Sequence, residues 1–406
     1  MGKRRIISNK TKMITKIAVA AVAVVMVATF VAGTVMTVQA SYARNKYNAY
    51  NRGIGGVRAA TMGEMNMHAS AMQAMTSARA MSTIEVSSGR VLYEKNANAK
   101  LPMASTTKIV TAITVLEHVK DINEIVKVHP KAVGIEGTSI YLQKGEELTV
   151  RELLLGLMLR SGNDASVALA LHVSNSVEEF GGLMNEVALK AGAKNSSFKN
   201  PHGLDEEGHY TTANDLARIS AYAMRNEQFA EIVATKSARI AGVEYPRVLH
   251  NKNRLLNSNK MVNGVKTGFT SKAGRCYVGS MERNDMQVVC VVLNCGPMFE
   301  ESETLMQRAT NEYFMHKVLA AETLITPTHP DRHNRVGMVA EDYFYPLKES
   351  EIKRIEIHLN DHDACVFLDD KLLMTAELLK LDEGHMEVEL DTDHAIMQPQ
   401  HEEEQR

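Results

Sequence analysis

The chain has 406 residues, of which 45% are hydrophobic, and its formal net charge is -2. This length corresponds to two or three domains with enough residues to form buried cores. Neither sign of charge forms a long block in the body of the chain. The sequence therefore lacks the basic stripe that nucleic acid binding requires, and we expect no nucleic acid partner.

The first 40 residues have the pattern of an export signal. Lys and Arg residues precede an uncharged apolar run at residues 17–38, and small residues flank Gln39 at the end of this run. That ending predicts cleavage after Ala40, yet the run is close to the roughly 20 residues that span a bilayer. The sequence is consistent with both a cleaved signal peptide and a retained membrane anchor. Either one places the rest of the chain outside the cytoplasm.

Next comes a segment at residues 41–79 that is rich in Ala, Met, Ser and Asn and has little apolar periodicity, so we interpret it as a linker. A folded domain is predicted at residues 80–325. Ile109, Ile113 and Leu116 recur at helical spacing. Further helices are predicted at residues 153–160, 167–173, 178–191, 213–225, 226–235 and 301–320, and strands at 80–86, 91–93, 264–270, 274–281 and 286–293.

Because these helices lie in the middle of the domain and the strands at both ends, distant parts of the chain are expected to form one sheet. The fold class is therefore α/β (α+β). A small β-rich domain is predicted at residues 335–395, with alternating strands at 355–359, 366–368 and 386–390, and an acidic tail at 396–406. The four cysteines are predicted to be free, since a hairpin turning at Asn284 and Asp285 places Cys276 opposite Leu293 and not opposite Cys290.

The stretch "ASTTKIVTAITVLEHV" places Ser105 and Lys108 three residues apart where a helix begins. Positions i and i+3 share a helical face, so the hydroxyl and the amine can meet. A lysine whose pKa is lowered by burial or by a second cation can activate a serine as a nucleophile. The same spacing recurs at Ser196 and Lys199 without an apolar helix after it, so the pattern alone is weak. The alternative is an N-cap serine beside a surface lysine.

Two further motifs change this balance. "RSGNDAS" contains Ser161 and Asn163 between two predicted helices, and "NGVKTGFTSKAG" contains Lys266, Thr267 and Gly268 on a predicted strand. The three motifs S-x-x-K, S-D-N and K-T-G occur together in serine β-lactamases and penicillin-binding proteins, and this chain has them in the same order with S-G-N as the second. Individually, the second motif fits a loop serine with a helix-capping asparagine, and the third a strand that ends in an exposed lysine.

Each motif has a chemical role. Ser161 can relay a proton to a leaving amine, and Asn163 can bind both a substrate amide and a lysine. Lys266 supplies a second cation and, with Thr267, can bind a substrate carboxylate. Gly268 leaves room for a substrate that lies alongside as an extra strand.

The chain resembles the low-molecular-mass penicillin-binding proteins that are serine-type D-alanyl-D-alanine carboxypeptidases. Beyond the three motifs, the resemblance extends to "FKNPHGLDEEGHYTTANDLARISAYAM" and "NKNRLL". It implies a transpeptidase-like domain with an antiparallel sheet, a helical subdomain and a β-rich domain after it. It also implies acylation of Ser105 by peptidoglycan stem peptides, an oxyanion hole of the Ser105 and Phe269 backbone N–H groups, and inhibition by β-lactams.

Two features depart from this family pattern. Phe269 stands where some members have a histidine, and the C-terminus lacks an amphipathic helix, so membrane attachment would depend on residues 17–38. His202 and His209 are expected to be structural.

Other functions are less consistent with the sequence. A class A β-lactamase needs an E-x-x-L-N element, which is absent between Asn163 and Lys266. A non-catalytic wall-binding or morphogenetic scaffold would not need the intact Ser105, Lys108, Ser161, Asn163 and Lys266. Metal catalysis lacks an H-E-x-x-H motif and paired Cys or His at zinc spacing, so we expect no metal and no cofactor.

Overall fold

The computed structural model describes residues 72–243, 245–325, 337–359 and 363–380. These residues form two compact units that divide after Glu312. The predicted export signal, the strand at residues 386–390, the acidic tail and most of the predicted linker lie outside the described residues. In the described part of the chain, no helix is long and apolar enough to cross a membrane.

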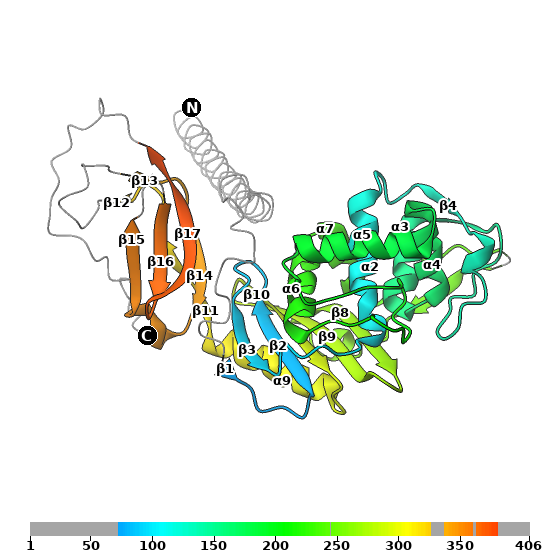
Figure 1. Ribbon diagram of the computed structural model, residues 1–406, viewed down its shortest axis with the longest axis horizontal. Helices are drawn as coiled ribbons and strands as arrows, with labels where there is room; N and C mark the ends of the chain where they lie inside the picture. The colour runs from blue at the N-terminus through cyan, green and yellow to red at the C-terminus, as the bar shows by residue number, and fades with distance from the viewer. Residues whose placement is uncertain (1–71, 244, 326–336, 360–362, 381–406) are drawn as a thin grey trace, which may run out of the picture. The chain divides into compact units, whose positions relative to one another are not determined.

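A six-stranded sheet organises the first unit, and it joins distant parts of the chain as predicted (Figure 1). Its order is β1-β3-β2-β10-β9-β8; β1 pairs with β3 in parallel and all other pairs are antiparallel. The strands are β1 Met72–Gln73, β2 Ala80–Glu85, β3 Val91–Lys95, β8 Val262–Thr270, β9 Gly274–Arg283 and β10 Met286–Leu293. The unit begins before the predicted residue 80, because β1 pairs with β3.

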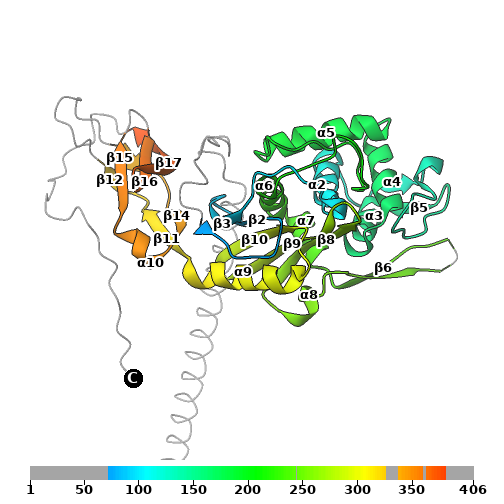
Figure 2. The ribbon, with the colours of Figure 1, turned by 60° about the horizontal axis from the view of Figure 1, so that its bottom comes forward.

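Helices cover both faces of this sheet (Figure 2). On one face, the Ser82 hydroxyl of β2 bonds to Asn214 of α6, while the other face carries α9, whose Met306 packs over Gly279 of β9. The helices of this unit are α2 Lys108–His118, α3 Val150–Leu155, α4 Asn163–Val173, α5 Val177–Lys190, α6 Ala213–Met224, α7 Glu227–Ala234, α8 Leu255–Ser258 and α9 Met298–Glu312.

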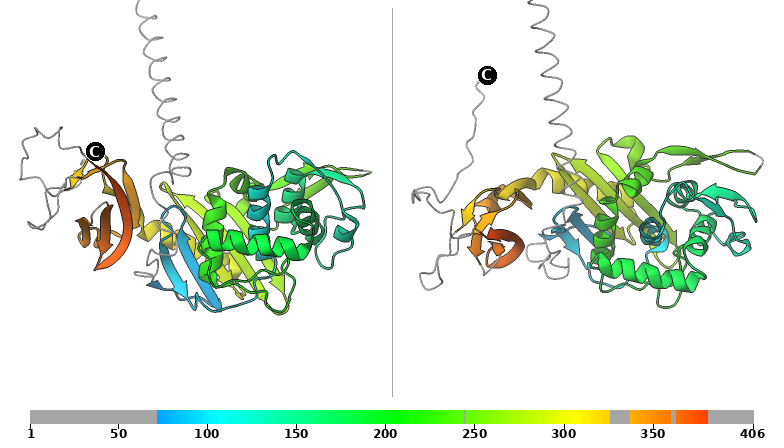
Figure 3. Two further views of the ribbon diagram at one scale, coloured as in Figure 1. Left: turned by 45° about the horizontal axis from the view of Figure 1, so that its top comes forward. Right: turned by 90° about the horizontal axis from the view of Figure 1, so that it is seen from above.

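Shorter elements complete the unit. They are the 3-10 turns η1 Ala104–Thr107 and η2 Pro130–Ala132, the π-helical turn η3 Gly156–Arg160, and the two-stranded pairs β4 Ile125–Lys127 with β5 Glu147–Thr149 and β6 Ser237–Ile240 with β7 Arg247–His250. The hairpin of β6 and β7 extends away from the main sheet (Figures 2 and 3).

Local sequence explains several of these boundaries. Thr149 and Glu152 form a capping box at the start of α3, and Thr212 accepts a hydrogen bond from the Asp215 N–H at the start of α6. Asn284 adopts a positive φ of 53° in the turn between β9 and β10, which is a conformation that asparagine tolerates.

The cysteines are all free, as predicted. The observed β9–β10 register places Cys290 opposite Gly279, so that Cys276 is not its partner. The thiols of Cys276, Cys290 and Cys295 are buried.

The second unit, which begins at Tyr313, is rich in strands. A two-stranded sheet pairs β11 Phe314–Leu319 with β14 Tyr343–Leu347, and a five-stranded sheet has the order β12-β13-β17-β16-β15. The remaining elements are β12 Leu324–Ile325, β13 Gly337–Val339, α10 Glu349–Ile352, β15 Ile355–Leu359, β16 Asp363–Leu368 and β17 Lys371–Lys380.

One predicted helix is too long. The sequence prediction continued it to Ala320, whereas α9 ends at Glu312 and the following residues form β11. The cause is tertiary pairing, since β11 forms an antiparallel ladder with β14, which lies about 25 residues further along the chain. The boundary between the units therefore falls at Glu312 and not at the predicted residue 325.

Candidate active site

Ser105 lies in the 3-10 turn η1, which continues directly into α2. The position at the start of a helix is as predicted, but the N-cap alternative is wrong. Met103 caps η1, Thr107 caps α2, and neither cap uses a side-chain hydrogen bond. The Ser105 hydroxyl is therefore not committed to capping and is available for other contacts.

Lys108 is fully buried, with an exposed fraction of 0%, so it is not the surface lysine of the alternative interpretation. Its Nζ lies 3.1 Å from Ser105 Oγ, 2.7 Å from Asn163 Oδ1 and 2.6 Å from the His202 carbonyl oxygen. Two of these partners are carbonyl groups that can only accept hydrogen bonds. A neutral amine would donate its two hydrogens to them and direct its lone pair to the serine hydroxyl.

Electrostatics favour this neutral form. Burial lowers the pKa of Lys108 well below its ordinary value, and the charges of Lys266 and Lys252 lower it further, while Asp164 acts in the opposite direction. These effects shift the amine that contacts Ser105 towards the neutral form that a general base requires.

Lys266 approaches from the sheet, on β8. It is 1% exposed, so the alternative of an exposed lysine at a strand end is wrong, and its Nζ donates to the Thr267 carbonyl oxygen at 2.9 Å. Burial, and then the charge of Lys252, lower the pKa of Lys266 to about 7. The side chain of Phe269 is 66% exposed beside this strand end.

Gly268 shows how closely β8 approaches Ser105. A Cβ atom on this glycine would lie 3.0 Å from the Ser105 backbone nitrogen and 3.1 Å from the Met103 carbonyl oxygen. Only glycine fits such a contact without displacing the backbone. β8 is also the edge strand of the described sheet, so its outer edge is not paired with another described strand.

The second motif lies where η3 ends and α4 begins. Ser161 adopts a left-handed φ of 65° in this turn, and Gly162 is the N-cap residue of α4. Asn163 is therefore not a helix cap; its Oδ1 accepts from Lys108 and its Nδ2 donates to the Glu136 carbonyl oxygen at 2.5 Å. The Ser161 hydroxyl is buried and has no hydrogen-bond partner among the described residues.

The second S-x-x-K pair has a different environment. The Ser196 hydroxyl bonds to Asp215 and Thr211, and the Lys199 side chain is exposed. The structure therefore brings Ser105, Lys108 and Asn163 into direct contact, with β8 beside them, and leaves this pair outside the site.

The two histidines of the neighbouring loop have structural contacts. His209 Nε2 lies 3.0 Å from the Thr107 hydroxyl, and His209 Nδ1 accepts from the Lys199 N–H at 3.0 Å. His202 contributes its carbonyl oxygen to Lys108. Burial lowers the pKa of both imidazoles to about 4, so both are neutral at physiological pH. These contacts fit the structural role that the sequence analysis expected.

Two parts of this site were missed by sequence reasoning. Lys252 is a third cation, and its charge lowers the pKa of both Lys108 and Lys266. Residues 136–142 contact Asn163 and Asp164. Neither belongs to a motif with a recognisable chemical spacing, and Lys252 was visible only as part of the "NKNRLL" resemblance.

A family model described as D-alanyl-D-alanine carboxypeptidase, Peptidase_S11, matches residues 66–296, which is more than half of the chain. The chain belongs to the peptidase S11 family. Among curated S11-like relatives, DacF of Bacillus subtilis is 37% identical over 241 residues, covering 57% of this chain and 62% of that protein. DacC of Escherichia coli is 38% identical over 245 residues, covering 56% of this chain and 60% of that protein. Both are named D-alanyl-D-alanine carboxypeptidases, and the chain matches about three fifths of the length of each.

Solved structures show the same fold as this S11 member. Penicillin binding protein 5 from Haemophilus influenzae superposes with a TM-score of 0.65 at 26% identity, covering 76% of this chain and 98% of that one. A serine-to-alanine mutant of the Streptomyces K15 DD-transpeptidase has a TM-score of 0.54 at 31% identity, covering 58% of this chain and 98% of that one. The transpeptidase-like fold class with an antiparallel sheet and a helical subdomain is thereby confirmed.

Proposed function

We propose that the chain is a serine-type D-alanyl-D-alanine carboxypeptidase that removes the terminal D-alanine from peptidoglycan stem peptides during cell-wall biogenesis. The observation that carries this proposal is the contact of the buried Lys108 amine with the Ser105 hydroxyl at 3.1 Å, in a site where burial and nearby cations lower the pKa of that amine. Membership of the S11 family supports the same substrate class.

The reaction begins when Lys108 Nζ takes the proton of Ser105 Oγ. The oxygen attacks the carbonyl carbon of the penultimate D-alanine, and the charge that develops on the carbonyl oxygen is stabilised by the backbone N–H groups of Ser105 and Phe269. The proton then passes through the Ser161 hydroxyl to the leaving amine, the C–N bond breaks, and the terminal D-alanine departs. The buried, unpartnered hydroxyl of Ser161 supports this relay.

Substrate binding falls to the other motif residues. The extended peptide lies along the open edge of β8, and the close approach of Gly268 to η1 brings this strand beside Ser105. Lys266 and Thr267 bind its terminal carboxylate, and Asn163 binds the adjacent amide while it holds Lys108.

The acyl-enzyme is then hydrolysed. A water molecule attacks the ester carbonyl, gives its proton to the Lys108 amine, and Ser105 recovers its hydroxyl proton as the shortened peptide leaves. β-Lactams acylate Ser105 in the same way, because their cyclic amide presents a carbonyl and a carboxylate at the corresponding positions. We propose no metal and no cofactor in this cycle.

Fluorescent penicillin tests the nucleophile. The wild-type protein should be labelled covalently, and Ser105→Ala should show no label, because no other group forms the ester. Lys199→Ala is the matched control, since it removes the lysine of the second S-x-x-K pair and should leave labelling unchanged. An unlabelled wild-type protein, as expected for a wall-binding scaffold, would refute the proposal.

Mass spectrometry of a pentapeptide ending in D-Ala-D-Ala, after incubation with the protein, should show loss of one alanine.

The location is part of the proposal. We place the catalytic residues outside the cytoplasm, associated with the membrane through residues 17–38 if these are retained, or released to the cell wall after cleavage behind Ala40. Mass spectrometry of the mature N-terminus distinguishes these two outcomes, since cleavage leaves Ser41 as the first residue.

A further inference from the structure

The orientation of Asn163 depends on residues 136–146, which we call the covering segment. Its Glu136 carbonyl accepts from Asn163 Nδ2 at 2.5 Å, and its Thr138 carbonyl accepts from the Asn163 backbone N–H at 2.7 Å. A Cβ atom on Gly137 would lie only 2.8 Å from Asn163 Nδ2, so the segment packs directly on the amide. These contacts with the covering segment thus fix the orientation of the Asn163 amide oxygen, which accepts a hydrogen bond from Lys108.

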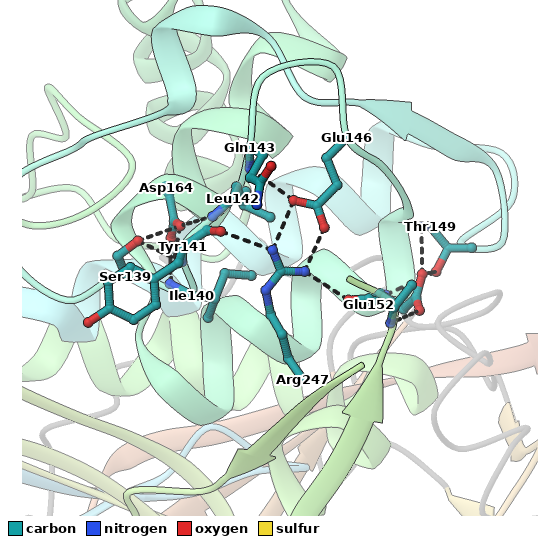
Figure 4. Close-up of polar contacts among 11 residues, drawn as sticks. Ser139, Ile140, Tyr141, Leu142, Gln143, Glu146, Thr149, Glu152, Asp164 and Arg247 are labelled. Atoms are coloured by element: carbon teal, nitrogen blue, oxygen red, sulfur yellow. Dashed lines mark hydrogen bonds and ion pairs between the residues drawn. The ribbon is translucent and has the colours of Figure 1, made fainter. Parts of the chain in front are cut away.

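This segment has no regular secondary structure between the end of η2 at Ala132 and the start of β5 at Glu147. Its position therefore depends on hydrogen bonds between its backbone and the side chains of residues outside the segment. One set of contacts comes from Asp164, next to Asn163. The Asp164 carboxylate accepts from the backbone N–H groups of Ile140 and Leu142, each at 3.0 Å, and from the Ser139 hydroxyl at 2.6 Å (Figure 4).

The second set of contacts comes from Arg247, at the start of β7. Its guanidinium binds both carboxylate oxygens of Glu146, at 2.6 and 2.9 Å, and donates to the Tyr141 carbonyl oxygen at 2.9 Å (Figure 4). The side chains are 18% exposed for Arg247 and 3% for Glu146. A bidentate pair of this geometry and burial is much stronger than an exposed ion pair.

The β6–β7 hairpin that carries Arg247 is itself anchored. The Ala241 N–H donates to Glu152 Oε1 at 2.8 Å, and the Ala241 carbonyl accepts from Arg247. From β7 the chain continues to Lys252, whose Nζ lies 3.4 Å from the Thr138 hydroxyl. The hairpin and the residues after it therefore contact the covering segment at both ends.

We propose that Arg247 is a positioning residue for the reaction: its pair with Glu146 holds the covering segment against Asn163 and so fixes the contact between Asn163 and Lys108. Arg247 does not touch the reacting atoms, and it acts through Glu146, Tyr141 and the carbonyl groups of the segment. This inference rests on the proposed function, because the geometry that it maintains is that of the proposed base.

Arg247→Ala tests this role. The rate constant of acylation by fluorescent penicillin, measured per titratable active site, should fall about 10-fold because the base is held less accurately. For the pentapeptide, kcat should fall while KM changes little, since the carboxylate-binding residues stay in place. Arg151→Ala, which removes an ion pair with Glu231 that involves no residue of the covering segment, is the matched control and should keep the wild-type rate constant.

Further variants separate positioning from folding. Arg247→Lys keeps the charge and should recover part of the rate, and Glu146→Ala should slow acylation like Arg247→Ala, with little further loss in the double variant. Hydrogen exchange at the Ile140 and Leu142 amides should accelerate in Arg247→Ala.

Three results would overturn the inference: fewer active sites with an unchanged rate constant per site, fully additive losses in the double variant, or unchanged exchange. Failure of the wild-type protein to label would instead refute the proposed function, and this inference with it.

Discussion

Burial and the neighbouring cations both lower the pKa of the Lys108 amine. The protonated amine cannot accept the Ser105 proton, so acylation should rise with pH through the Lys108 pKa. Below its own pKa of about 7, Lys266 is charged and helps to lower the pKa of Lys108. In Lys266→Gln this charge is absent, so the Lys108 pKa rises. The acid limb of the pH–rate profile, in which acylation increases with pH, should therefore move to higher pH.

The measurement is the penicillin acylation rate constant of Lys266→Gln and wild type across neutral pH. Lys199→Gln is a suitable control, because it removes an exposed lysine that is not among the causes of the Lys108 shift. An acid limb that stays in place or moves to lower pH would contradict the electrostatic account.

Sequence reasoning found the residues whose spacing carries chemistry. Ser105 and Lys108 were identified from one helical turn, and Asn163 from a short motif, and the structure brings all three into contact. Lys252 was not identified, because its effect is a charge acting through space from a distant part of the chain. Such an effect leaves no periodic or spaced pattern in the sequence.

At the scale of elements, the approach of β8 to η1 depends on Gly268. In Gly268→Ala the new methyl group would meet the Ser105 nitrogen at 3.0 Å, which forces β8 and η1 apart. We expect acylation by penicillin to slow by about 100-fold, since small displacements at a reacting centre have large effects on rate.

The control is Gly182→Ala in α5, where a Cβ atom would meet no atom within 4 Å. It should keep the wild-type rate and raise the free energy of unfolding by about 0.5 to 1 kcal/mol, because alanine is the better helix former. If Gly268→Ala acylates as fast as Gly182→Ala, the close packing of the strand is not required.

Most elements of the first unit could be predicted, because their hydrophobic periods and caps are local. The strands on either side of Asn284 and the helices α5 and α6 lie where the pattern placed them. The end of α9 was missed because pairing between β11 and β14 decides it, and the covering segment was missed because it has no period at all.

At the scale of the whole molecule, the described residues of the site all belong to the first unit. The Streptomyces K15 structure matches 58% of this chain over 98% of its own length. That solved relative therefore contains almost nothing beyond the matched region. We therefore expect a chain that ends at Glu312 to be acylated by penicillin with the rate constant of the full chain.

Fluorescent labelling and thermal unfolding of both chains test this expectation. A truncated chain that folds cooperatively but labels much more slowly would show that the strand-rich second unit contributes to the reaction.

The free cysteines have a consequence for the redox behaviour of the protein. Burial raises the pKa of the Cys276 and Cys295 thiols to about 11 and that of Cys290 to about 12, so almost none of them is thiolate at neutral pH. Thiolate is the form that attacks disulfides and reacts with oxidants. Folding of the chain should therefore need no oxidase or disulfide isomerase, and dithiothreitol should leave both its melting temperature and its labelling by fluorescent penicillin unchanged.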